Sequence, residues 1–174
     1  MPIRDKNRAR GFTLLELMLV LALVGLLATL VLPRLDVLTG AELDTASRRI
    51  SNRVRYLREE AARRGIWIRL VALPEEKLLL TEEGVETPEG WVFVSGEGPL
   101  YRPLKLPDSL TLQLGGPGAR PTADGRLGVL FAADGYVDPT VVQIADDSGR
   151  IVSILIEPAR TRPRVIDGPV AGMR

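Results

Sequence analysis

The chain opens with a long apolar run near its N-terminus. Residues 12–32 read FTLLELMLVLALVGLLATLVL, and Glu16 is the only charge among them. As an α-helix this run is about 31 Å long, which matches the hydrocarbon core of a bilayer. Basic residues precede the run, so the positive-inside tendency places the N-terminus in the cytoplasm and the rest of the chain outside it. We therefore expect one membrane-spanning helix.

Beyond Pro33 the apolar residues follow a helical period. They recur at spacings of three and four and predict one buried helix face, at Leu43, Ala46, Ile50, Val54, Leu57 and Ala61. The opposite side carries Arg48, Arg49, Arg53, Arg55 and Arg58. We interpret these arginines as a solvated face, with a nucleic-acid surface as the alternative. Gly65 is a candidate C-cap, so the helix is expected to end near Arg64.

After Gly65 the pattern changes to short β-like runs separated by turn residues. The candidate strands are residues 66–72, 77–81, 91–94, 110–114, 127–131, 141–145 and 150–156. Asp147, Ser148 and Gly149 predict a tight hairpin turn between the last two. The Gly/Pro-rich stretches 95–107 and 115–125 are predicted to be exposed loops. The expected fold class is α+β, with an antiparallel β-rich head packed on the long helix.

Composition argues against enzymatic chemistry. The 174 residues include no cysteine and no histidine, which removes disulfides, thiolate metal sites and the commonest general base. The serine, aspartate and lysine residues of the head form no catalytic spacing. Four acidic loop residues, Asp134, Asp138, Asp146 and Asp147, are interpreted as turn formers. We therefore expect no enzyme activity, no cofactor and no bound metal.

The N-terminal residues carry a specific resemblance. A basic leader followed by Gly11, Phe12, Thr13, Leu14, Leu15, Glu16 and an apolar helix resembles the class III signal of type IV pilins and type II secretion pseudopilins. The resemblance implies that prepilin peptidase cleaves between Gly11 and Phe12 and N-methylates Phe12. It also implies an assembly role for Glu16 and a helix kink at Pro33. Electrostatics supports the role of Glu16, because its carboxylate can neutralise the new amine at Phe12.

Segments of the head resemble one branch of that family, the minor pseudopilin H of type II secretion and related minor pilins (GspH/FimT-like). They are Gly90-Trp91-Val92-Phe93, the run from Phe131 to Gly135, and residues 151–156 followed by Arg160, Arg162 and Arg164. The resemblance implies a structural subunit at the tip of a periplasmic pseudopilus that takes part in protein secretion. The alternative is a minor type IV pilin involved in pilus assembly or DNA uptake. In that case the three arginines could contact DNA, although this chain has Thr161-Arg162-Pro163-Arg164 where some relatives have Gly-Arg-x-Arg.

These interpretations together predict the organisation and the location of the protein. The expected segments are a cleaved leader at 1–11, a transmembrane helix at 12–33, an amphipathic stem helix at 34–65 and a β-rich head at 66–174. The protein is expected in the bacterial inner membrane, with a single span and a periplasmic head. The expected partners are prepilin peptidase, other minor and major pseudopilins or pilins and the membrane itself. Neither a small-molecule substrate nor, on the leading interpretation, a nucleic acid is expected.

Overall fold

A computed structural model describes residues 14–170, except for the side chains of residues 28–39. The chain divides into two compact units, Met1–Val37 and Leu38–Arg174. The predicted leader, with Gly11 and Phe12, lies outside the described residues. The predicted segment boundaries, at 11/12, 33/34 and 65/66, therefore stay predictions.

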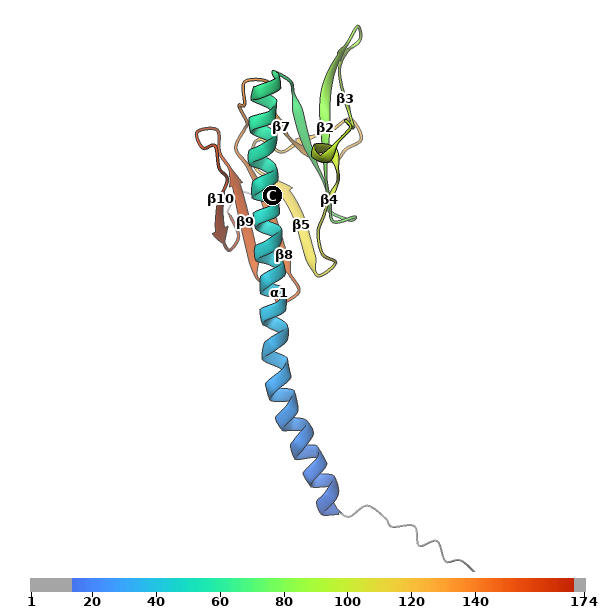
Figure 1. Cartoon of the computed structure of the whole chain (residues 1–174), viewed down its shortest axis with the longest axis vertical. Coiled ribbons are helices and arrows are strands. Elements are labelled where there is room, and N and C mark those ends of the chain that lie inside the picture. Colours follow the sequence, from blue (N-terminus) through green and yellow to red (C-terminus); the bar gives the residue numbers. More distant parts are fainter. Residues whose placement is uncertain (1–13, 171–174) are drawn as a thin grey trace, which may run out of the picture. The chain divides into compact units, whose positions relative to one another are not determined.

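Helix α1 runs from Leu14 to Arg64 (Figure 1). In the first unit, the side chains of residues 14–27 are exposed and Glu16 lies in the first helical turn. Across the residues described with side chains, 14–27 and 40–170, no helix is both long enough and apolar enough to cross a membrane. Part of the predicted span, together with Pro33 and its predicted kink, lies outside those residues.

In the second unit, the C-terminal part of α1 buries the predicted apolar face. Leu43, Ala46, Ile50, Val54, Leu57 and Ala61 are each at most 2% exposed. Burying a leucine, isoleucine or valine of this kind contributes about 1.5–3 kcal/mol, so this face fixes the helix to the head. The helix ends as predicted: Gly65 has φ 67°, and the N–H groups of Gly65 and Ile66 both donate to the Ala61 carbonyl.

The strands form two antiparallel sheets beside the helix (Figure 1). Sheet A has the order β3 (Gly90–Val94), β2 (Leu78–Thr87), β1 (Ile68–Leu73), β7 (Leu127–Phe131) and β6 (Arg120–Pro121), and β4 (Leu104–Lys105) also pairs with β2. Sheet B has the order β10 (Arg164–Asp167), β9 (Ile151–Ile156), β8 (Thr140–Asp146) and β5 (Leu110–Gly115). The predicted α+β fold class, with a helix packed on an antiparallel β-rich head, is confirmed.

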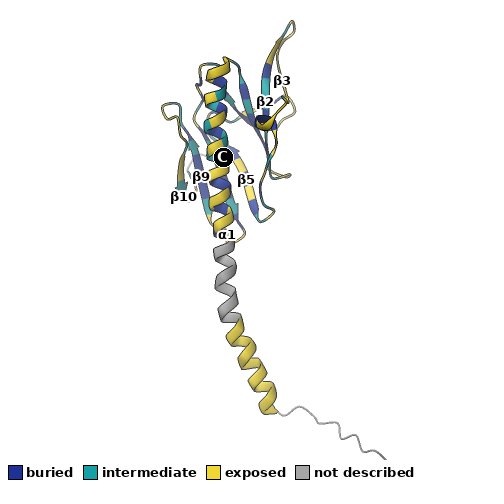
Figure 2. Ribbon diagram, in the orientation of Figure 1, coloured by how far each residue is buried: buried dark blue, intermediate teal, exposed yellow. Residues whose placement is uncertain are grey.

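The core lies between the helix face and the inner faces of both sheets. Strand β1 shows the alternation that positions it, because Ile68, Leu70 and Ala72 enter the core cluster while Arg69 points to the other face of sheet A. Phe131, at the end of β7, is the bulkiest fully buried side chain among the residues whose burial is described. Figure 2 shows the buried residues following one side of the stem and the strands beside it.

The prediction of two exposed loops is wrong in part. Within 95–107 the chain forms a short 3-10 helix, η1 (Pro99–Tyr101), and Leu100, Tyr101 and Leu106 are buried in the core. Within 115–125 it forms β6, and Thr122 is buried. Glycine and proline correctly marked breaks in regular structure, but isolated apolar residues between them pack against the helix and sheet A.

The β8–β9 hairpin has the predicted turn at Asp147–Gly149, and Asp146 holds it. Its Oδ1 accepts hydrogen bonds from the Ser148 hydroxyl at 2.6 Å and from the N–H groups of Ser148 and Arg150, each at 3.0 Å. The Ser148 hydroxyl, followed by these backbone donors, lowers the pKa of the Asp146 carboxyl below its ordinary value. Gly149 completes the turn with φ 86°.

Asp146 is expected to make stability depend on acid pH. Because its pKa is lowered in the folded state, its contribution is present above the unfolded pKa and is lost as pH falls through the folded value. Thermal unfolding of the purified chain should therefore show that Asp146→Asn destabilises at pH 7 and loses this difference toward pH 2. Asp147→Asn, at the exposed neighbouring position, is the control and should follow the parent protein at both pH values. An Asp146→Asn difference that is unchanged at low pH would contradict this assignment.

Candidate functional site: the arginine-bearing stem and the head loops it holds

The residues of the predicted cleavage and methylation site are not among those that the structure describes. Gly11 and Phe12 are among residues 1–13, so cleavage between them and methylation of Phe12 stay predictions. Glu16 is described and has an exposed side chain in the first turn of α1. A helix N-terminus is a favourable place for a carboxylate, which is compatible with its predicted pairing to the Phe12 amine. That assembly role also stays a prediction.

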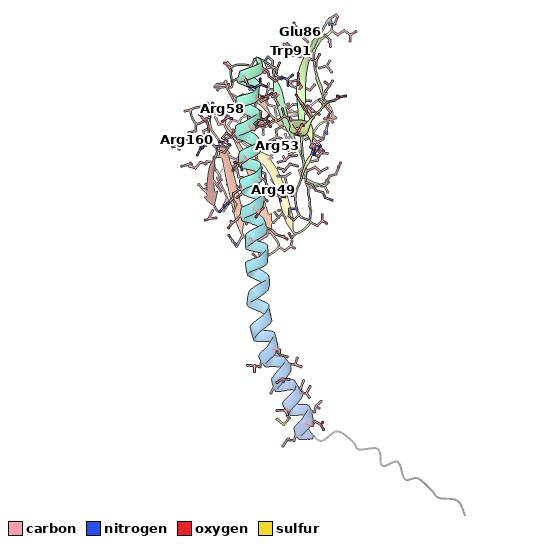
Figure 3. All side chains as sticks on the ribbon, viewed as in Figure 1. Arg49, Arg53, Arg58, Glu86, Trp91 and Arg160 are labelled. Atoms are coloured by element: carbon pink, nitrogen blue, oxygen red, sulfur yellow. The ribbon has the colours of Figure 1, made fainter. Side chains whose placement is uncertain are left out.

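The five stem arginines do not form one solvated face. Arg48 and Arg49 are exposed, and Arg55 lies 4.0 Å from Glu59 on the next turn. Arg53 and Arg58 instead reach backbone carbonyls of the head (Figure 3). The interpretation as a solvated face is therefore wrong for these two residues, because distant loops of the head wrap around the flanks of the helix.

Arg53 holds the segment around η1 against the stem. Its Nη1 donates to the carbonyl oxygens of Leu100 at 2.5 Å and Arg102 at 3.1 Å, and to the Thr81 hydroxyl at 3.3 Å. Burial lowers the pKa of the Arg53 guanidinium. Because the acceptors are carbonyls and a hydroxyl, this arginine satisfies loop backbone groups and makes no ion pair within the described part of the chain.

Arg58 does the same on the other flank of the helix. Its guanidinium donates to the carbonyl oxygens of Glu157, at 3.1 Å, and of Pro158 and Arg160. The planar guanidinium has several donors in a fixed arrangement, so one side chain can hold a turn of backbone. Arg58 therefore positions residues 157–160, from which the arginine-rich C-terminal segment begins.

Replacing Arg58 is expected to loosen this segment and the head. Arg58→Met keeps the apolar stem of the side chain but leaves three carbonyls without their donor, at a cost of about 2 kcal/mol in the free energy of unfolding. Arg48→Met on the same helix is the matched control, because Arg48 is exposed, and should change stability by less than about 0.5 kcal/mol. Urea unfolding followed by tryptophan fluorescence measures both. Equal stabilities of the two variants would show that the hydrogen bonds of Arg58 do not stabilise the head.

The three C-terminal arginines occupy different environments. Arg160 is exposed and its Nε lies 3.1 Å from Glu157 Oε2. Arg162 lines a small hollow with Ser51, Asn52, Arg55 and Pro163, and Arg164 is the first residue of β10. Arg162 and Arg164 are exposed and have no ion-pair partner within residues 40–170. The structure thus leaves two of the three free to meet an anionic surface.

A cluster of hydrogen bonds and an ion pair joins the C-terminal end of the stem helix to the head. Arg64 binds both carboxylate oxygens of Glu83 at 2.9 Å and also donates to the Tyr101 hydroxyl at 3.0 Å. The bonds to Tyr101 and Glu83 raise the pKa of Arg64, while burial, followed by the bond to Glu83, raises the pKa of Tyr101. These contacts join α1, β2 and η1. Their perturbed pKa values therefore reflect a structural connection.

The acidic loop residues are engaged in turns and surface ion pairs. Asp134 Oδ1 accepts from the Tyr136 N–H at 2.8 Å, and Asp138 pairs with Arg120 at 2.8 Å. On another turn, Arg126 and then the Thr122 hydroxyl lower the pKa of Asp124 to about 2. Among the side chains that the structure describes, in residues 14–27 and 40–170, no group of three or more acidic residues is placed to hold a metal ion.

An aromatic cluster on the outer face of sheet A was not predicted. Trp67 and Trp91 meet edge to face, with ring centroids 6.4 Å apart, and the Arg69 guanidinium lies 4.1 Å above the Phe93 ring. Leu130 joins them around a shallow hollow. The sequence indicated a strand at residues 91–94. The sequence does not show which face of this strand is exposed, because its apolar residues are consecutive and do not alternate with polar ones.

Comparison with known proteins finds a motif match at the N-terminus and a similar fold. Residues 6–32 match the prokaryotic N-terminal methylation motif. The fold is similar to that of the minor pseudopilin EpsH from the type 2 secretion system of Vibrio cholerae, in two structures with TM-scores of 0.57 and 0.56 at 16% identity. The likeness covers 75% and 72% of this chain and 97% of the EpsH chain in each of the two structures. The chain thus combines the methylation motif with a pilin-like fold.

Other comparisons add less. The minor pilin FimU of Pseudomonas aeruginosa is 20% identical over 74% of this pilin-like chain and 90% of FimU, with a TM-score of 0.44, too low to bear on the fold. No curated protein matches the sequence. The motif and the fold, found on one chain, support the predicted resemblance to pilins and to the GspH/FimT-like branch.

Proposed function

We propose that this pilin-like chain is a minor pseudopilin of a type II secretion system, a structural subunit of the periplasmic pseudopilus tip. The observation that carries the proposal is the fold likeness to EpsH over 97% of the EpsH chain in that structure, found in a protein that also has the methylation motif. The described head supports a structural role, because its perturbed ionisable groups serve turns and contacts between elements. The chain acts as a building block and not as an enzyme.

In this proposal the N-terminal residues carry maturation and assembly. Prepilin peptidase removes residues 1–11 and methylates Phe12, which leaves a charged secondary amine at the start of the helix. Glu16 neutralises an amine of this kind within its own or a neighbouring subunit, which makes burial of both charges tolerable. Residues 12–33 anchor the protein in the inner membrane until assembly, with Pro33 allowing the helix to bend. The head then lies in the periplasm beside other pseudopilins.

Genetic loss of the protein tests this role. In the source bacterium, deleting the gene should leave secreted proteins in the periplasm and should leave surface pili and DNA uptake intact. Restoring the full chain should restore export, and restoring a Gly11→Val version should not. A deletion strain that exports normally but lacks pili or takes up no DNA would contradict the assignment to secretion.

The second candidate is a minor type IV pilin that contacts DNA. One observation favours it: Arg162 and Arg164 are exposed and lack ion-pair partners in the described part of the chain. The test is fluorescence anisotropy of labelled duplex DNA with the purified chain at physiological salt. The secretion role predicts only weak, salt-sensitive binding. Tight binding that is lost when Arg160, Arg162 and Arg164 become alanine would favour the pilus role.

A further inference from the structure

The outer face of sheet A carries a hollow lined by aromatic rings. Its volume is about 220 Å³, and the residues that line it are Trp67, Trp91, Phe93 and Leu130. The register places the three rings on one face, because Phe93 lies opposite Gly84, whose N–H donates to the Trp67 carbonyl at 2.8 Å. Glycine fits closely beneath the rings, since a Cβ atom at position 84 would lie 3.0 Å from Trp67 Cβ and 3.3 Å from Phe93 Cε1. We call the four lining residues the aromatic hollow.

The rings of the aromatic hollow face solvent and not the core. Trp91 is 53% exposed, whereas Trp67 and Phe93 are half-buried. The two tryptophans meet edge to face, with ring centroids 6.4 Å apart, and they are the only tryptophans of the sequence. Large rings contribute most to stability when they are covered, so a concave group of them at the surface indicates a place where a ligand binds.

The charge beside the aromatic hollow is negative. Glu86 lies directly opposite Trp91 on the neighbouring strand, so both side chains point to the same face of the hairpin. Figure 3 shows the two residues side by side near the tip of the hairpin. Glu86 is exposed and has no ion-pair partner within residues 40–170, and residues 78–101 contain glutamates and no lysine or arginine. A cationic ligand is therefore favoured here, and an anionic one is repelled.

The chain already places one cation against a ring on this face. The Arg69 guanidinium lies 4.1 Å from the centroid of the Phe93 ring, an arrangement in which the ring attracts the positive charge. That charge is compensated, because Arg69 donates from Nε at 2.8 Å and from Nη2 at 2.5 Å to the Glu82 carboxylate. The carboxylate of Glu86 has no such compensation from the described residues. A ligand can therefore supply the positive charge that this part of the face lacks.

The side chains of the aromatic hollow restrict which cation can enter it. A lysine ammonium carries three N–H donors and a guanidinium carries five, and each donor needs an acceptor when water is removed. Tryptophan offers only an N–H donor, and phenylalanine and leucine offer no hydrogen-bonding group. A quaternary ammonium group has no N–H donor, so it can lose its water against the rings without leaving a hydrogen bond unmade.

We propose that the aromatic hollow binds a quaternary ammonium group of the kind that choline carries. The rings of Trp67 and Trp91 contact its methyl groups, and Glu86 supplies the opposite charge. A phosphate close to the ammonium, as in a choline lipid headgroup, would lie against the glutamates, so the ligand is a cation without an attached anion. The inference goes beyond the proposed function and does not rest on it, because it concerns a ligand of the head and not secretion.

Choline and an uncharged analogue of the same shape test the proposal. The full-length chain is kept in dodecyl maltoside, which has neither charge nor a choline group, and both tryptophans report binding because they line the hollow. Choline chloride should change their fluorescence in a saturable way, and sodium chloride at the same ionic strength should not. Choline should bind about tenfold more tightly than dimethylbutanol, in which carbon replaces the charged nitrogen. Phosphocholine should bind more weakly than choline.

Substitutions separate the contribution of charge from that of the rings. Glu86→Gln should weaken choline binding by about five- to tenfold and leave dimethylbutanol binding unchanged. The matched control is Glu75→Gln, in the exposed turn between β1 and β2, which should bind choline like the parent protein. Trp91→Leu, followed by saturation-transfer NMR of the choline methyl groups, should lower the affinity about tenfold, and Trp91→Phe should recover part of it.

Several outcomes would overturn the proposal. Equal affinities for choline and dimethylbutanol, or an unchanged choline affinity in Glu86→Gln, would show that the hollow binds apolar groups whatever their charge. The absence of a saturable change with choline would show that it binds no such cation. Tighter binding of phosphocholine than of choline would contradict the charge argument and assign the hollow to a lipid headgroup.

Discussion

Replacing Phe131 with alanine is expected to lower the free energy of unfolding by about 3–5 kcal/mol. The ring is fully buried where β7 ends, within the cluster formed by the stem helix and both sheets. Loss of the ring leaves a cavity. The helix and strands around it are held by their other contacts, so they can move to fill the cavity only in part. Because single domains of this size are stable by roughly 5–15 kcal/mol, such a loss consumes a large share of the stability.

The matched control is Phe93→Ala. Phe93 is half-exposed on β3 and its ring contacts the Arg69 guanidinium, so its removal should cost less than about 1.5 kcal/mol. Urea unfolding of both variants and the parent, under the same conditions, gives the comparison. If Phe131→Ala were no less stable than Phe93→Ala, the core would not be centred where the helix meets the two sheets.

Replacing Glu16 is expected to abolish assembly while leaving insertion and cleavage intact. Removing the carboxylate lowers the cost of placing the helix in a bilayer by about 2–3 kcal/mol, so Glu16→Ala should insert at least as well as the parent. In a filament, however, the amine at Phe12 would be buried without its partner, which typically costs about 3–5 kcal/mol. A cost of this size is enough to displace the subunit from its position in the filament.

Two further substitutions separate the effect of charge from that of size. Glu16→Gln keeps the shape and removes the charge, so it should behave like Glu16→Ala, whereas Glu16→Asp keeps the charge and should assemble better than either. Co-purification with partner subunits from membranes measures assembly, and the mass of each chain reports cleavage. Normal recovery of the Glu16→Ala complex would remove the pairing argument.

The stem helix could be predicted because the residues that determine it are close together in the sequence. Spacings of three and four identified the buried face, and Gly65 marked the end of the helix. The strands with several apolar residues were also found. Strands β4 and β6 were missed because two-residue strands have no measurable period, and β10 because it begins in a stretch of arginine and proline. Strand β2 continues beyond its predicted end, since its residues from Glu83 to Thr87 pair with β3.

The roles of the stem arginines were not predictable in the same way. Helical period says which side of the helix a residue occupies, but not that a loop far along the chain returns to it. Arg53 and Arg58 bond carbonyls that follow them by 47 to 102 residues, so nothing near them in the sequence distinguishes them from Arg48 or Arg49. The exposure of Trp91 was hidden for a related reason, because strand pattern does not reveal which strand lies at a sheet edge.

The mature N-terminus tests the central claim most directly. Mass spectrometry of the protein extracted from membranes of a strain with active prepilin peptidase should find a chain that begins at N-methyl-Phe12, with residues 1–11 removed. Gly11→Val should instead accumulate as the full-length precursor, because the residue at the cleavage site is changed. A native protein that still begins at Met1 in that strain would contradict the assignment of the chain to pilin-like assembly.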